Sequence, residues 1–299
     1  MPVKAIDCEV PVLWPWLGGK ARLARWIAGR LPPHRCYVEP FAGTAAVLLA
    51  KAPAPLEVLN DANGDLVAVY RCLQDPGQAR RLYRRLRHTP ISRLEWERAH
   101  EPADDPVERA ARFLVRQLQG FGGKPDASTW GGGLGDNLPD RLATTLRRWR
   151  AAQRRLRGVV LECGDWRAVV DRYERPDTLV YADPPYLTDD PRDAYGVGRF
   201  GPAEHAALVE RLLAYEGLAV VSGYPHPLYE RLEAAGWVRE ARRVSVNVLG
   251  RTMASGLAGG RLGEEHYRAD CLWWSPRAWR LARRQLRFDD LGEEAWAGR

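Results

Sequence analysis

One short run of residues combines a carboxylate, two prolines and an aromatic ring. Asp183-Pro184-Pro185-Tyr186 directly follows an apolar run that ends at Ala182. Proline has no backbone N–H and restricts its own φ, so the pair predicts a stiff, extended turn at the end of a strand. Such a turn would aim the Asp183 carboxylate and the Pro184 carbonyl at one point, where two acceptors suit an amino group with two N–H donors. The Tyr186 ring offers a flat face on which a heterocycle can stack.

A second group of candidate binding residues lies near the N-terminus. The run from Glu39 to Ala45 contains Phe41 and Gly43 and joins a short apolar run to a helical pattern, and Asp61 follows the next apolar run eighteen residues after Gly43. In open α/β sheets, ligands bind at the carboxyl ends of the strands, and an acid there can accept hydrogen bonds from a ribose diol. The spacing is close to the ~20 residues expected of such a pair. A tight turn followed by a solvated acid would produce the same pattern.

These residues need a sheet to position them. Short apolar runs alternate with helical patterns along most of the chain, which predicts βα units and a largely parallel sheet. Seven runs are predicted as strands: Cys36–Glu39, Leu56–Leu59, Val159–Cys163, Thr178–Ala182, Leu218–Ser222, Arg242–Val248 and Ala269–Trp274. Helices are expected between and around them, over residues 20–31, 44–51, 65–73, 203–215 and 228–235.

The middle of the chain has a different character. Between about Gln74 and Gly158 the strand-like runs disappear, and arginine-rich helical patterns flank a glycine-rich stretch over 120–137. This change predicts a helical insertion or a small second domain. Its basic residues are candidates for contact with the phosphates of a polyanionic partner, and those we select are Arg81, Arg84, Arg85, Lys124, Arg147 and Arg148. Solvated helix faces in an arginine-biased protein would look the same, because 41 of the 45 basic residues are arginine.

Several motifs, taken in order, resemble the Dam-type (D12 class, α group) DNA adenine-N6 methyltransferases. They are Trp16-Leu17-Gly18-Gly19-Lys20, Glu39-Pro40-Phe41-Ala42-Gly43, Asn60-Asp61-Ala62-Asn63 and Asp183-Pro184-Pro185-Tyr186. Later runs, such as Val221-Ser222-Gly223-Tyr224, resemble the phage and prophage branch of that family. The glycine-rich motif departs from the family pattern, because Thr44-Ala45 replaces a stretch that normally contains a second glycine.

The resemblance carries specific expectations. It implies S-adenosylmethionine as the methyl donor and a class I methyltransferase fold with a mostly parallel, seven-stranded mixed sheet. It implies a catalytic domain formed by residues 1–73 and 158–299, with a helical target-recognition domain inserted at 74–157. It also places a set of residues at cofactor-contacting positions: Trp16, Lys20, Glu39, Phe41, Gly43, Asp61 and Asp183.

The expected reaction is transfer of a methyl group to N6 of an adenine flipped out of double-stranded DNA. An adenine inside the duplex cannot reach such a site, so flipping is required. Asp183, Pro184, Pro185 and Tyr186 would form the catalytic corner. Three alternatives stay open: methylation of cytosine N4, methylation of an RNA base, and a non-catalytic DNA-binding module.

Composition limits the remaining possibilities. The chain has 299 residues, 45% of them hydrophobic and 28% charged, which is typical of a globular protein. It has no apolar stretch of membrane-spanning length and no basic-then-apolar signal pattern at its start. Its five cysteines are scattered without zinc-ligand spacing. We therefore expect a cytoplasmic protein without metal, monomeric by default, that acts alone or beside a restriction enzyme of the same specificity.

Overall fold

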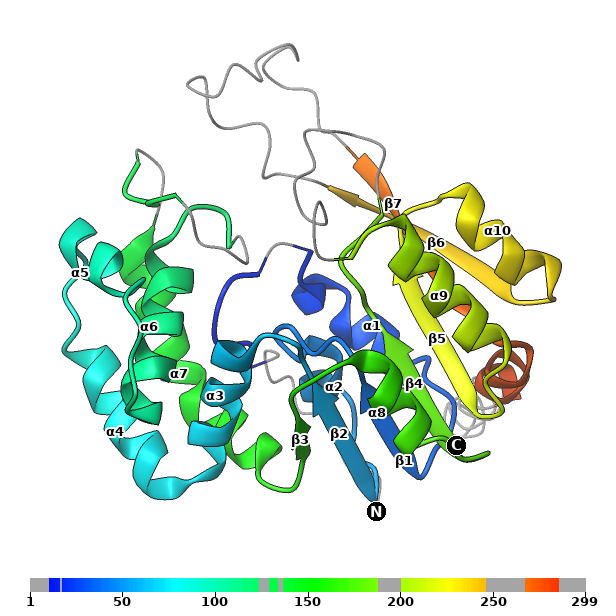
Figure 1. Cartoon of the computed structure of the whole chain (residues 1–299), viewed down its shortest axis with the longest axis horizontal. Coiled ribbons are helices and arrows are strands. Elements are labelled where there is room, and N and C mark those ends of the chain that lie inside the picture. The colour runs from blue at the N-terminus through cyan, green and yellow to red at the C-terminus, as the bar shows by residue number, and fades with distance from the viewer. Residues whose placement is uncertain are drawn as a thin grey trace, which may run out of the picture. The chain divides into compact units, whose positions relative to one another are not determined.

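The computed structural model describes residues 11–16, 18–123, 129–133, 137–187, 200–245 and 267–284. The chain folds as two compact units, Met1–Tyr173 and Glu174–Arg299. In both units, strands are accompanied by helices, as Figure 1 shows. The fold is therefore of the α/β class.

Three parallel strands form the sheet of the first unit: β1 (Cys36–Glu39), β2 (Leu56–Asn60) and β3 (Val160–Glu162). Both β1 and most of β2 are buried, as is usual for strands of a parallel sheet covered on both faces. Short helical elements complete this part of the unit: η1 (Lys20–Arg22), α1 (Ala24–Ala28), α2 (Ala46–Ala50) and α8 (Trp166–Arg172).

Five further helices belong to the same unit: α3 (Gly64–Gln74), α4 (Pro76–Arg87), α5 (Arg93–Arg98), α6 (Pro106–Gln119) and α7 (Leu138–Leu156). They lie side by side in Figure 1, with α6 packed on α3, α4 and α5. Capping explains where three of them begin. Asp75, Asp105 and Asn137 each accept a hydrogen bond from a backbone N–H in the first turn of α4, α6 and α7, and a proline occupies that turn.

The second unit has a mixed sheet. Strand β4 (Thr178–Ala182) pairs in parallel with β5 (Leu218–Gly223), and β7 (Tyr267–Trp274) runs antiparallel between β5 and β6 (Val238–Ser245). Helices α9 (Pro202–Leu213) and α10 (Pro227–Ala234) lie in this unit, and a last helix covers residues 276–284. The side chains of Trp273 and Trp274 are fully buried in its core.

The seven strands follow the order β3-β2-β1-β4-β5-β7-β6. This mostly parallel sheet with one antiparallel strand confirms the predicted fold class. Two predicted elements differ from the structure. The helix expected over 20–31 is the 3-10 turn η1 followed by the short α1. The strand expected over 242–248 begins earlier, at Val238, and α8 had not been expected at all. That residues 74–157 form a separate functional domain stays a prediction.

Candidate functional site

Two of the predicted cofactor residues, Gly43 and Asp61, are hydrogen-bonded to each other in the first unit. The Gly43 backbone N–H donates to Asp61 Oδ2 at 3.0 Å, and the Asn63 N–H donates to Asp61 Oδ1 at 2.8 Å. The carboxyl ends of β1 and β2 are thus tied together by one carboxylate. Burial raises the pKa of Asp61, and these two hydrogen bonds partly offset that effect because they favour the ionised form.

The backbone at Gly43 is shaped for close approach by another group. Gly43 has φ of 47°, in the left-handed region that favours glycine. A Cβ atom at this position would lie 3.3 Å from the indole Nε1 of Trp16, so the Trp16 ring covers the glycine turn. The Tyr70 hydroxyl donates to the Gly43 carbonyl at 2.7 Å and fixes the turn from the side of α3.

Lys20 lies in the same N-terminal region. Its side chain is buried, with only 4% of the residue exposed, and its Nζ donates to the Gly18 carbonyl at 2.9 Å. The Gly19 N–H donates to the Trp16 carbonyl at 2.9 Å. Trp16 and Lys20 are therefore connected through one tight turn, and their contact with a cofactor stays a prediction.

Glu39 and Phe41 contact other parts of the first unit. The Glu39 carboxylate is buried and accepts hydrogen bonds from the Tyr37 hydroxyl at 2.6 Å and the Leu48 N–H at 2.8 Å. It thereby fixes α2 against β1. The Phe41 ring is partly exposed and lies 6.1 Å from the ring of Trp166, centroid to centroid.

The structure adds residues that sequence reasoning missed, at the carboxyl end of β3. Asn60 Nδ2 donates to the Pro40 and Gly164 carbonyls at 2.9 and 3.1 Å, and the Gly164 N–H donates to Asn60 Oδ1 at 3.0 Å. Asn60 thus connects the ends of three strands and brings the turn before α8, with Trp166, beside Phe41. The sequence did contain a signal, since Gly164-Asp165 directly follows a predicted strand.

The predicted catalytic corner lies in the second unit, at the end of β4. The Ser222 hydroxyl, at the end of β5, donates to Asp183 Oδ1 at 2.5 Å. Ser222 is fully buried, whereas Asp183 is only partly buried. The hydroxyl fixes one carboxylate oxygen, so the orientation of Asp183 is set by its neighbour on the next strand.

Tyr186 is held by two neighbours. Its hydroxyl donates to Asp270 Oδ1 at 2.7 Å, and its ring meets the ring of Tyr224 edge-on, with centroids 4.7 Å apart. Burial is the main reason that the pKa of Tyr186 lies well above its usual value, and the nearby Asp183 charge adds to the effect. Tyr224 was named above only within a run that resembles the family and Asp270 was not singled out, and the structure makes both part of this corner.

The predicted DNA-binding arginines have different environments. Arg81 pairs with Asp105 at 3.1 Å and Arg85 with Glu108 at 3.1 Å. Arg148 donates to the Val12 carbonyl at 3.1 Å, and its burial lowers its pKa. Arg84 and Arg147 are exposed, whereas Lys124 lies outside the described residues. The selected residues therefore do not share one environment.

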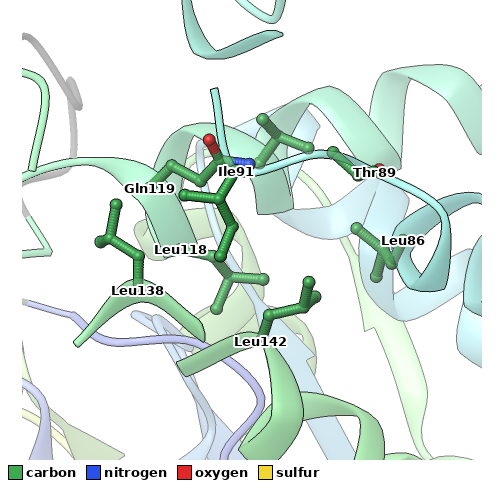
Figure 2. Close-up of a pocket in the computed structure, with 8 residues that line it drawn as sticks. Leu86, Thr89, Ile91, Leu118, Gln119, Leu138 and Leu142 are labelled. Carbon is green, nitrogen blue, oxygen red and sulfur yellow. The ribbon is translucent and has the colours of Figure 1, made fainter. Parts of the chain in front are cut away.

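A small apolar pocket lies among the helices of the first unit. Figure 2 shows leucine side chains from α4, α6 and α7 pointing into it, with Ile91 and Gln119 at its rim. Gln119 donates to the Pro90 carbonyl at 3.0 Å and accepts from the Ser92 N–H at 3.1 Å. Its polar atoms thus hold the protein's own backbone, and we assign this pocket to packing.

Metal sites and membrane spans can be considered for the residues that the structure describes. Those residues contain no group of three or more His, Cys, Asp or Glu side chains that could hold a metal ion. Within the same part of the chain, no helix has the length and apolar character needed to cross a membrane.

The site residues and the fold define an α/β protein with a glycine turn bonded to an acid at the ends of two strands and an acidic Pro-Pro corner. Residues 16–212, well over half of the chain, match the model of the D12 class N6 adenine-specific DNA methyltransferases. The chain belongs to this family. Membership implies S-adenosylmethionine as the methyl donor.

Individual relatives are more distant. The chain is 29% identical over 184 residues to the DNA N-6-adenine-methyltransferase of Escherichia phage P1, which covers 58% of this chain and 24% of the phage protein. It is 29% identical over 113 residues to the DNA adenine methylase of Escherichia coli K12, covering 36% of this chain and 40% of that protein. The chain thus spans less than half the length of either relative.

A solved structure is also similar in arrangement. The rRNA methyltransferase aviRa from Streptomyces viridochromogenes aligns over 94% of this chain and 96% of its own, with 14% identity and a TM-score of 0.39. At this identity and score, the likeness adds nothing about substrate or activity.

Proposed function

We propose that this chain transfers the methyl group of S-adenosylmethionine to the N6 amino group of an adenine in double-stranded DNA. The observation that carries the proposal is the Asp183-Pro184-Pro185-Tyr186 corner, in which Ser222 orients the carboxylate. Family membership supports the same reaction.

The first unit offers residues that fit the methyl donor. A side chain at the left-handed Gly43 turn would crowd the Trp16 ring, and Asp61 joins the ends of two strands there. An acid and a glycine turn at this edge suit a ribose and the groups attached to it. Trp16, Lys20, Phe41 and Asp61 would hold the donor, which supplies an electrophilic methyl group on a cationic sulfonium.

The acceptor needs help because the N6 lone pair of adenine is delocalised into the ring. Asp183 and the Pro184 carbonyl would each accept one N6–H, which favours a pyramidal nitrogen with an available lone pair. As the N–C bond forms and the C–S bond breaks, positive charge develops on N6, and the Asp183 carboxylate stabilises it. One N6 proton would then leave along its hydrogen bond to the Asp183 carboxylate and pass on to water, and the neutral thioether of the donor would be the other product. No strong base is required before the transfer, so positioning and electrostatics provide most of the effect.

The aromatic residues of the corner would receive the flipped base. Extrusion costs a few kcal/mol of stacking and pairing, and stacking on an aromatic side chain returns about 1–3 kcal/mol per base. Tyr186 is anchored by Asp270 and Tyr224, so its ring needs little further ordering when a base arrives.

The direct test is Asp183→Ala, assayed with tritiated cofactor and mixed-sequence duplex DNA. We expect methylation to fall by at least two orders of magnitude, because the variant loses the carboxylate that stabilises the developing charge. Circular dichroism checks that the variant still folds, and calorimetry with S-adenosylmethionine measures separately how far donor binding changes, because the resemblance also places Asp183 at a cofactor-contacting position. Undiminished methylation by Asp183→Ala would overturn the mechanism.

The finer expectations about partners stay predictions. We predict that the enzyme is a monomer and that it is located in the cytoplasm. A restriction enzyme that acts on the same DNA site is an optional partner. Methylation of cytosine N4 is an alternative outcome of this DNA assay, and methylation of RNA would be detected by the same assay with RNA in place of the duplex.

A further inference from the structure

One buried histidine in the second unit has a ring nitrogen that lacks a hydrogen-bond partner. His205, on α9, is fully buried, and its Nδ1 lies 2.8 Å from the Tyr229 hydroxyl. The Phe200 ring meets the imidazole edge-on, with centroids 4.7 Å apart. The other ring nitrogen, Nε2, is also buried but has no partner of hydrogen-bond geometry within the described part of the chain. A buried nitrogen in this state costs free energy, which favours any conformation in which a partner reaches it.

The partner within reach is the carbonyl of Pro185, in the predicted catalytic corner. Burial lowers the pKa of His205 to about 4, and the Pro185 carbonyl opposes this effect because it favours the protonated imidazole. Since Tyr229 occupies Nδ1, the nitrogen left for the carbonyl is Nε2. Hydrogen bonds of an active site are often long before the substrate binds and shorten in the reactive complex. The gap between Nε2 and the carbonyl is therefore one that substrate binding can close.

The two neighbours of the imidazole select one tautomer. A neutral imidazole has one N–H donor and one acceptor nitrogen. With the proton on Nδ1, the lone pair of Nε2 would face the Pro185 oxygen, and two acceptors would oppose each other. With the proton on Nε2, the Tyr229 hydroxyl donates to Nδ1 and the Nε2–H is directed to the carbonyl. Burial raises the pKa of Tyr229, and the charge of Asp183 raises it further, so this hydroxyl keeps the proton that it donates.

Tyr229 holds the imidazole from a fixed position. Its ring stacks on Trp273 of β7, with centroids 4.7 Å apart and 19° between the planes. Gly223, at the end of β5, lies against both rings, because a Cβ on it would be 3.4 Å from each. A continuous series of contacts thus leads from the sheet through Tyr229 and His205 to Pro185.

The chemistry of proline explains why the corner needs such a contact. Neither Pro184 nor Pro185 has a backbone N–H, so hydrogen bonds can fix the backbone of this pair only through its carbonyls. The proposed reaction uses the Pro184 carbonyl for the amino group of the base. The Pro185 carbonyl is left for the protein, and it belongs to the peptide that leads into Tyr186.

We propose that His205 is a positioning residue for methyl transfer: its Nε2–H donates to the Pro185 carbonyl in the reactive complex and fixes the orientation of the Pro-Pro turn. This inference rests on the proposed function, which supplies the reaction that the turn serves. His205 acts through Pro185 and touches neither the base nor the donor. A misplacement of about 1 Å can cost ~100-fold in rate, so even a small shift of the turn is measurable.

The kinetic test compares His205→Phe, which keeps an aromatic ring but loses the N–H, with His205→Gln, which keeps an N–H donor. Single-turnover methyl transfer is measured at saturating donor and duplex DNA. We expect a rate about tenfold below the wild type for His205→Phe and within about threefold of it for His205→Gln. The matched control is Leu208→Ala, also fully buried on α9, which should lower stability but not the transfer rate. Circular dichroism verifies that each variant folds.

A second measurement does not depend on activity. A long-range proton–nitrogen correlation spectrum of the labelled wild type reports which ring nitrogen carries the proton, and the His205 signal is assigned by its absence from His205→Gln. We expect the proton on Nε2 at neutral pH. A proton on Nδ1 overturns the inference whether or not the chain methylates DNA.

The outcomes separate this inference from the proposed function. A wild type that methylates DNA while His205→Phe is equally fast, or while His205→Phe and His205→Gln are equally slow, overturns the positioning role alone. A wild type that leaves DNA unmethylated overturns the proposed function, even where the proton is found on Nε2. A slow His205→Phe beside a nearly normal His205→Gln, with the proton on Nε2, supports both.

Discussion

Ala45 shows how a single departure from the family motif is accommodated. It is fully buried at the start of α2 and has φ of 51°, in the left-handed region that costs a non-glycine residue roughly 1–2 kcal/mol. The sequence already marks this position, because Ala45 stands where the family pattern has glycine. The consequence for the backbone could not be predicted, since the sequence does not give φ.

Replacing Ala45 with glycine should therefore cost little. We expect the free energy of unfolding of Ala45→Gly to lie within about 0.5 kcal/mol of the wild-type value, because relief of the left-handed strain offsets the lost burial of the methyl group. The control is Ala68→Gly, a buried alanine inside α3, which should destabilise by about 1 kcal/mol or more. Equal losses in the two variants, measured by denaturant unfolding, would contradict the assigned strain.

His205 is the other residue whose role only the structure reveals. It is fully buried on α9, its Nδ1 is 2.8 Å from the Tyr229 hydroxyl, and burial lowers its pKa to about 4. An unfolded chain binds this proton near pH 6.5, whereas the folded chain does not. The contribution of His205 to stability is thus complete above about pH 6.5 and lost as the pH falls toward 4.

The loss across that window should be of order 2–3 kcal/mol. Free energies of unfolding measured from pH 7 to pH 4 would reveal it as a steeper decline in the wild type than in His205→Gln, which retains a hydrogen-bonding group but cannot take up the proton. Parallel pH profiles would show that His205 is protonated in the folded state as readily as in the unfolded state.

At the scale of elements, the segment after α6 is connected directly to the candidate cofactor residues. Gly120 and Trp130 form an antiparallel bridge, and Gly123, with φ of 64°, lies against the backbone of Pro15 and Trp16. A Cβ on Gly123 would approach this backbone to 2.8–2.9 Å, closer than atoms tolerate. The position of Trp16 over Gly43 therefore depends on an element that is distant in sequence.

Gly123→Ala should raise the KM for S-adenosylmethionine roughly three- to tenfold, because it displaces Trp16 from the glycine turn. The control is Gly158→Ala, where a Cβ would meet no atom within 4 Å, and its KM should match the wild type. If Gly123→Ala retained a normal KM while its thermal stability fell, the contact would serve stability alone.

Pattern and register explain why most strands could be predicted. Buried parallel strands such as β1 and β4 are continuous apolar runs, which the sequence reveals without tertiary information. Strand β6 was misplaced because its half-exposed, arginine-rich residues lack that signal. Helix α8 is only seven residues long, too short for periodicity to identify it.

At the scale of the whole molecule, motif order predicted the family and the two groups of site residues. It did not predict which partners orient them, because Ser222 and Asp270 reach the Asp183–Tyr186 corner only through the pairing of β5 with β4 and β7. Nor could it sort the arginines, since paired and unpaired ones alternate along the same helices. Composition sets the net charge of +7, but folding decides where that charge is exposed.

The central claim is best tested by identifying the modified base itself. Duplex DNA incubated with the purified chain and S-adenosylmethionine would be digested to nucleosides and analysed by mass spectrometry. We expect N6-methyladenine with the wild type and none with Asp183→Ala. Detection of N4-methylcytosine instead, or of unmodified DNA from a chain that binds the donor, would contradict it.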